Sequence, residues 1–235
     1  MYMSSILPPS HVGRKPLPIR YIHVSHNDHE YTVGILHSGD AFVIDREDYE
    51  KIRPFSWHKT ANAYISCGAY VDSIKRTLYL HNLVMGKLTF SGKGQHETVD
   101  HVNRNGLDNR KENLRILSQT DQNLNQRKKP RTVELPVDCG VSPTEIPKHI
   151  WYVRANGLHG DRFAIEFKTE DILWRSTSSK AFTLKDKLRA ATTKLVELYT
   201  VYPYLDPDNP DILEDMRALN ESFDLIVSAA KLESA

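Results

Sequence analysis

Three groups of polar residues in the middle of the chain have the types and spacing needed for metal-assisted hydrolysis. Asp100 and His101 are adjacent, Asn113 follows twelve residues after the histidine, and Asn123 comes ten residues later. A neutral imidazole accepts a proton from water near neutral pH. Carboxylate and amide oxygens bind a hard divalent cation. The pattern therefore predicts a site that combines one base with one cation.

The elements around these residues predict two strands followed by a helix. Residues 97–101 form the first expected strand, and Asn105-Gly106 is a turn signal before a second strand at 113–117. Ser118 with Asp121 three residues later is typical of a capping box that starts a helix, and Pro130 ends it.

The segment VDHVNRNGLDNRKENLRILSQTDQNLNQRK, from Val99 to Lys128, resembles the ββα-metal motif of HNH endonucleases of the phage, viral and intron-encoded homing type. The resemblance implies that Asp100 binds the metal, His101 activates water, Asn113 braces the loop between the strands and Asn123 supplies a second ligand. It also implies Mg²⁺ as cofactor, with Mn²⁺ able to substitute, and double-stranded DNA as substrate.

One spacing departs from the usual pattern of this motif. The ligand normally lies nine residues after the Asn of the Asn-Leu pair, which is Gln122 here, whereas Asn123 lies at ten. A one-residue insertion at the helix cap is easily absorbed in a turn, which favours Asn123. Gln122 and, less well, Asn125 stay open as alternatives.

The net charge of +1 hides a strong asymmetry. Residues 104–131 carry eight Lys/Arg and three acids, whereas residues 205–235 carry eight acids and two bases. The basic stretch predicts contacts with DNA phosphates. The residues expected to make them are Arg110, Lys111, Arg115, Arg127, Lys128 and Lys129.

Short alternating segments before the motif predict a small mixed module and an α+β fold class overall. Residues 1–18 are rich in proline, which predicts a flexible arm. The nuclease domain is expected at residues 19–130, with its ββα motif at about 97–128. A short helix at 46–52 is expected to start at an Asp45 cap, and another helix near His81. The expected strands are 20–24, 31–36, 41–44, 64–67 and 77–80.

Residues 131–204 predict a second module of three strands, at 150–155, 162–167 and 172–177, followed by a helix capped by Thr183. This order weakly resembles the Apetala-type DNA-binding domain, which implies that the sheet lies in a DNA groove. The sheet carries Trp151, Tyr152, Arg154, Arg162 and Trp174. For Trp151 and Trp174 a position in the core is favoured over a groove contact, because aromatic residues of a three-stranded sheet usually pack in the core. Residues 205–235 predict a separate acidic helix, entered at Pro210.

Composition excludes several classes of protein. No apolar run approaches the eighteen residues of a membrane span, so no membrane partner is expected. The first twenty residues lack the apolar core of a signal peptide, which predicts an intracellular protein, plausibly encoded by a phage or virus and acting in its host. Cys67 and Cys139 are too far apart for a zinc-ligand motif or a disulfide scaffold.

The leading interpretation is an HNH endonuclease that nicks or cuts double-stranded DNA, of homing type. The alternative is a DNA-binding protein that keeps the ββα scaffold without cleavage, and a third is a nuclease that acts on RNA or without sequence preference. The irregularly spaced histidines 23, 26, 29 and 37 are assigned no metal.

Overall fold

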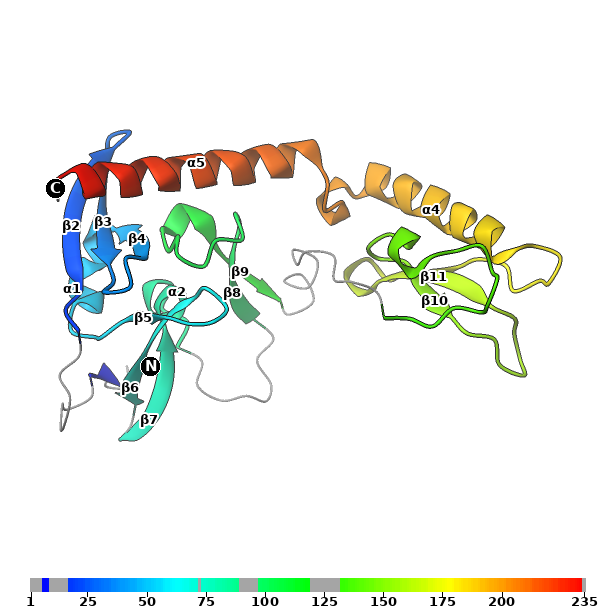
Figure 1. Cartoon of the computed structure of the whole chain (residues 1–235), viewed down its shortest axis with the longest axis horizontal. Helices are drawn as coiled ribbons and strands as arrows, with labels where there is room; N and C mark the ends of the chain where they lie inside the picture. The colour runs from blue at the N-terminus through cyan, green and yellow to red at the C-terminus, as the bar shows by residue number, and fades with distance from the viewer. Residues whose placement is uncertain (1–5, 9–16, 72, 89–96, 119–131, 234–235) are drawn as a thin grey trace. The chain divides into compact units, whose positions relative to one another are not determined.

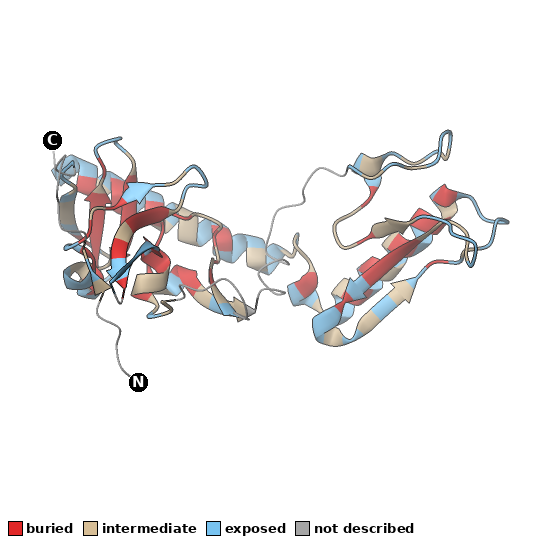
Figure 2. Ribbon diagram, turned by 90° about the horizontal axis from the view of Figure 1, so that it is seen from below, coloured by how far each residue is buried: buried red, intermediate tan, exposed pale blue. Residues whose placement is uncertain are grey.

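The structure is a computed structural model that describes residues 6–8, 17–71, 73–88, 97–118 and 132–233. Helices and strands alternate along it, which confirms the α+β class. The chain divides into two units: residues 1–122 with 213–235 form unit 1, and residues 123–212 form unit 2. Each unit has a hydrophobic core of its own (Figure 2). Within the described ranges, no helix is long and apolar enough to cross a lipid bilayer.

The first sheet of unit 1 is an antiparallel meander of β2 (Arg20–His26), β3 (His29–Ile35) and β4 (Ala41–Asp45). Its first turn has two residues, Asn27 and Asp28, and both have positive φ (49° and 62°), as a tight hairpin turn between twisted strands requires. Strand β4 is buried from residue 41 to 44, because both faces of the sheet are covered.

The second sheet of unit 1 has β6 at its centre. Strand β7 pairs with one edge of β6, and the short strands β1 and β5 pair with the other. The elements of this region are β1 (Ile6–Leu7), α1 (Tyr49–Ile52), β5 (His58–Lys59), β6 (Ile65–Val71), β7 (Ile74–Tyr79) and α2 (Leu80–Val84).

Two expectations for this region are wrong. Residues 6 and 7, placed in a flexible arm, pair with β6, and the side chain of Ile6 packs against the core. Asp45 makes no cap for the following 3₁₀ turn (Arg46–Asp48), because its carboxylate accepts the backbone N–H of Lys111 instead (2.8 Å).

The expected hairpin is present as β8 (Glu97–His101) and β9 (Leu114–Ser118), which pair antiparallel with His101 opposite Leu114. The loop between them adds to the first sheet: the N–H of Val43 donates to Leu107 (3.0 Å), and the N–H of Asn109 donates to Val43 (2.8 Å). The loop between β8 and β9 is therefore held against strand β4 by backbone hydrogen bonds.

The C-terminal helix α5 (Pro210–Glu233) belongs to unit 1 from residue 213 onward, whereas the sequence suggested a separate segment at 205–235. It lies along β2 and β3 (Figure 1). Its buried residues Phe223, Ile226 and Val227 form one cluster with side chains of that sheet. Its apolar stripe therefore completes the core of unit 1.

Unit 2 is an antiparallel sheet covered by a helix, in the expected order. Thr183 starts the helix with a complete capping box, in which its hydroxyl accepts from the N–H of Asp186 (3.1 Å). The cluster between sheet and helix contains Phe163, Ile165 and Leu195. The elements are β10 (Trp151–Val153), β11 (Arg162–Phe167), β12 (Ile172–Arg175) and α4 (Leu184–Val201).

Candidate active site

The hairpin presents Asp100 and His101 at the end of β8. The ladder is regular through both residues, so their side chains point to opposite faces of the strand. The Asp100 carboxylate is partly exposed and accepts from Nε and Nη2 of Arg115, its cross-strand neighbour, at 3.3 and 3.1 Å. His101 points inward and is 4% exposed.

A hydrogen bond to Asn109 orients the His101 ring. Its Nε2 lies 3.5 Å from Oδ1 of Asn109, and the amide nitrogen of Asn109 donates to the carbonyl of Gly106 (3.3 Å). An amide oxygen only accepts, so Nε2 carries the proton and Nδ1 is the basic nitrogen. Burial lowers the pKa of His101, so the ring is neutral near pH 7. This is the protonation state that a general base needs.

Aromatic rings surround His101. The ring centroids of Tyr64 and His81 lie 5.6 and 5.1 Å from that of His101, and the His81 ring stands edge-on at 83°. Burial, together with the charge of His101, lowers the pKa of His81 to about 3. Tyr79 stacks on His81 at 5.5 Å and 21°. Packing thus fixes the orientation of His101 from several sides.

Asn113 joins the two ends of the loop, which is the position that the resemblance implies. Its Oδ1 accepts the N–H of Asn103 (2.9 Å), and its Nδ2 donates to the carbonyl of Asp108 (2.8 Å). The side chain of Asn103 in turn donates to the Asp108 carboxylate (2.8 Å). All three side chains are at least 96% buried. The loop that carries Asn109 is therefore rigidly held.

Arg110, expected from the sequence to contact DNA, is buried in this structure. Its side chain is 0% exposed and forms a paired salt bridge with Asp108 (2.7 and 2.8 Å). It also donates to the hydroxyl of Ser222 (2.8 Å) and the carbonyl of Leu219 (2.9 Å), both in α5. Its positive charge is used to attach the site loop to the C-terminal helix.

The other described residues that were expected to contact phosphates differ in exposure and in ion pairing. Lys111 is paired with Glu47 and, at 3.0 Å, with buried Asp48, which neutralises most of its charge. The side chain of Arg115 is 42% exposed and is paired with Asp100. Several expectations fall outside the described residues: Gln122, Asn123, Asn125, Arg127, Lys128 and Lys129. Within the described ranges, no three His, Cys, Asp or Glu side chains form a group that could hold a metal ion.

Sequence reasoning missed Asn109 and Tyr64 as neighbours of His101, whereas His81 was expected to pack near the site. Asn109 lies in a loop with several asparagines, so its residue type gives no distinguishing signal. Tyr64 and His81 come from parts of the chain that precede the motif, and only the packing of β6 and α2 beside β8 brings them there.

In unit 2 the aromatic and basic residues named for the DNA groove lie on two different faces of the sheet. Tyr152 and Trp174 pack against the core under α4, because alternation along β10 and β12 turns them toward the helix. Trp151 and Arg162 lie on the other face, where Trp151 is opposite Ala164 and Ala164 is opposite Arg175. Trp174 thus lies with the core, as was favoured for it from the sequence, and Tyr152 lies there too.

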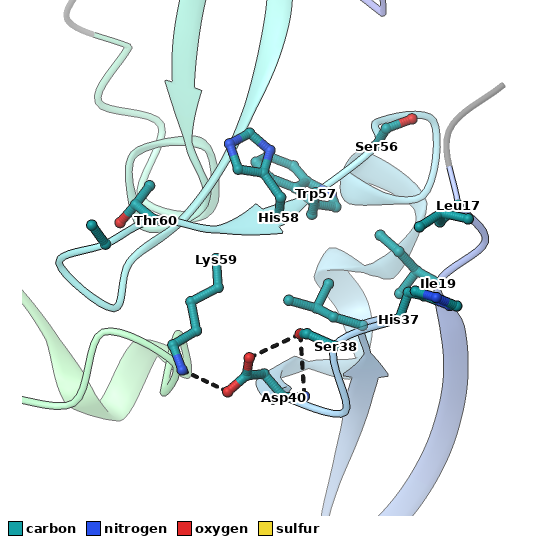
Figure 3. A pocket seen from close by; sticks show the side chains of 12 residues that line it. Leu17, Ile19, His37, Ser38, Asp40, Ser56, Trp57, His58, Lys59 and Thr60 are labelled. Atoms are coloured by element: carbon teal, nitrogen blue, oxygen red, sulfur yellow. Dashed lines mark hydrogen bonds and ion pairs between the residues drawn. The ribbon is translucent and has the colours of Figure 1, made fainter. Parts of the chain in front are cut away.

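A separate cavity of about 700 Å³ lies in unit 1 (Figure 3). Trp57 and Leu36 are among its apolar lining residues, and Lys59 pairs with Asp40 at its rim (2.6 Å). Its described lining residues all precede residue 62, so none comes from the β8–β9 hairpin.

Comparison with known proteins gives one informative similarity. An uncharacterized protein of Acanthamoeba polyphaga mimivirus is 30% identical over 168 residues, which are 69% of this chain and 47% of that protein. The chain thus spans about half the length of this relative. No family model matches the chain. No solved structure matches it either.

Proposed function

We propose that this protein is an HNH-type endonuclease that hydrolyses phosphodiester bonds of double-stranded DNA, as homing enzymes do. One observation carries the proposal: burial keeps His101 neutral at the end of β8, where Asn109 orients its ring and Asp100 is the preceding residue. The similarity to a mimivirus protein supports an enzyme of viral or phage type that works inside a host cell.

In this proposal Nδ1 of His101 accepts a proton from a water molecule as the water oxygen attacks phosphorus. The P–O3′ bond breaks, and the departing oxygen takes a proton from solvent. Asp100 and Asn123 would hold Mg²⁺ or Mn²⁺, and the partly exposed carboxylate of Asp100 fits a cation that prefers oxygen ligands. The bound cation supplies stabilisation of negative charge on the phosphate and the departing oxygen. Arg115 competes with that cation for the same carboxylate.

Unit 2 is proposed to add affinity for DNA. The face of its sheet turned away from α4 carries Trp151, Arg162 and Arg175, whose types suit contacts with bases and phosphates. The alternative function, a DNA-binding scaffold without cleavage, is favoured by the burial of His101 and by the pairing of Asp100 with Arg115.

Nicking of supercoiled plasmid with Mg²⁺, and with EDTA as control, tests the proposal. We expect nicking only with the metal ion, and its loss in His101→Gln and Asp100→Asn. His37→Gln, which changes an exposed turn histidine, is the matched control and should nick normally. DNA binding without nicking in Mg²⁺ and in Mn²⁺, across plasmids carrying randomised inserts, would favour the scaffold.

A further inference from the structure

One face of the second sheet of unit 1 is open and leads to the candidate active site. On β6 and β7 the alternate residues Cys67, Ala69 and Leu78 are buried in the core. The residues between them point the other way, and β5 and β1 add one residue each. This open face consists of Leu7, His58, Ser66, Gly68, Tyr70, Lys75, Thr77 and Tyr79.

Most of these side chains are exposed, which is unusual for so many tyrosines and apolar residues on one surface. Tyr70 is 36% exposed, Tyr79 37% and Leu7 59%, and His58, Lys75 and Thr77 are also exposed. Lys75 makes no ion pair with any residue in the described ranges, and it faces Tyr70 across the strands. A surface of tyrosine, threonine and lysine combines hydroxyl donors, aromatic faces and an unneutralised cation.

Basic residues outnumber acidic ones in this region, although Lys59 and Lys87 are paired with Asp40 and Glu97. Residues 54–87 contain four Lys/Arg and a single acid, Asp72, which lies outside the described ranges. The basic stretch found at 104–131 is therefore not the only one in the nuclease unit, and in that stretch Arg110 and Lys111 are already paired. Positive charge with hydroxyl donors is complementary to a phosphate backbone.

The open face is continuous with the active-site histidines. Tyr79, the last residue of β7, stacks on His81 at 5.5 Å, and the His81 ring lies 5.1 Å from that of His101. Lys75 lies four residues before Tyr79 on the same strand, a distance of about 13 Å at the usual rise of about 3.3 Å per residue. That length corresponds to about four base pairs of a DNA strand.

We infer that the open face of β5, β6 and β7 holds the DNA backbone on one side of the scissile phosphate. Lys75 and the hydroxyls of Tyr70 and Thr77 contact successive phosphates, and Tyr79 guides the strand to His101. This inference rests on the proposed nuclease function, because it is His101 that makes the end of this face the reacting end.

Binding of a random-sequence 40-base-pair duplex in EDTA, measured by fluorescence anisotropy over a salt series, tests the inference without cleavage. Lys75→Gln should weaken binding several-fold and lower the slope of log affinity against log salt by about 0.9, the value for one phosphate contact. Lys75→Arg should restore both. Lys51→Gln removes the same charge from a lysine already paired with Asp48 (2.5 Å) and should change neither.

The position of the contact gives a second readout. A photoreactive amino acid placed at position 75 should crosslink about four to seven base pairs from the nick and always on the same side of it, because the steps from Tyr79 to His81 (5.5 Å) and from His81 to His101 (5.1 Å) add to the length along β7. Equal binding by Lys75→Gln and Lys51→Gln, or crosslinks on both sides, would overturn the inference even if the protein nicks DNA. Weakened binding in Lys75→Gln together with no nicking by the wild type would overturn only the nuclease proposal. A change of oligomeric state with unaltered DNA binding would assign the face to a second copy of the chain.

Discussion

Replacing Arg110 by methionine should destabilise unit 1 strongly, because it leaves a buried charge without its partner. Asp108 is 0% exposed, and its carboxylate accepts two bonds from the guanidinium. Loss of one member of a buried ion pair costs about 3–5 kcal/mol. The lost bonds to Ser222 and Leu219 act in the same direction, since they attach α5 to the loop.

Urea unfolding followed by circular dichroism measures this effect. Arg110→Met should lower the free energy of unfolding by about 3–5 kcal/mol. The urea midpoint should fall accordingly, with the slope of the transition nearly unchanged. Combining it with Asp108→Asn should recover part of the loss, because the double variant no longer buries a lone charge. Arg115→Met breaks a pair whose arginine side chain is 42% exposed and should cost less, about 1 kcal/mol.

The reasoning would be refuted by an Arg110→Met variant that is nearly as stable as the wild type but binds DNA more weakly with a smaller salt dependence. That result would restore Arg110 as a phosphate contact and would require a rearrangement of α5.

Three further predictions concern single side chains. Burial lowers the pKa of His81 to about 3, so the unfolded chain takes up a proton below about pH 6.5 that the folded chain does not. Stability should therefore fall by about 2 kcal/mol from this group between pH 7 and pH 5, and urea unfolding at both values should show a smaller fall in His81→Asn. Gly106→Ala would place a methyl group 2.5 Å from the carbonyl oxygen of Ala63 and should cost about 1–3 kcal/mol by thermal unfolding, whereas Gly157→Ala, which meets open space, should not. Thr183→Ala removes the cap of α4 and should cost about 1 kcal/mol, seen as faster hydrogen exchange in the first turn of that helix; unchanged exchange there would show that the cap contributes nothing.

Local patterns predicted most of the elements because the same patterns determine the local structure. Residues 97–101 and 162–167 were expected to be strands, and both are strands with those bounds. Thr183 was expected to cap a helix because its hydroxyl satisfies a free backbone N–H, and it does so. The Asn-Asp turn of the first hairpin follows from the same kind of local chemistry.

Long-range pairings were not predictable in this way. A basic residue in a basic stretch looks like a phosphate contact, yet the partner of Arg110 in α5 lies more than one hundred residues away in sequence. The amphipathic stripe of α5 was visible, but the stripe does not say which sheet it covers. The Tyr64 ring beside His101 was missed for the same reason, since it comes from a part of the chain before the motif.

The discontinuity of unit 1 sets the order in which the protein can be completed during synthesis. The elements of unit 2 are contiguous, whereas unit 1 needs residues from both sides of them. While the ribosome is still translating unit 2, Arg110 has no Ser222 to bind, and the sheet of β2, β3 and β4 has one face uncovered. Unit 2 can therefore fold first, and unit 1 closes only when α5 has emerged. A chain cut short before that helix would carry Asp100 and His101 without the support that holds their loop.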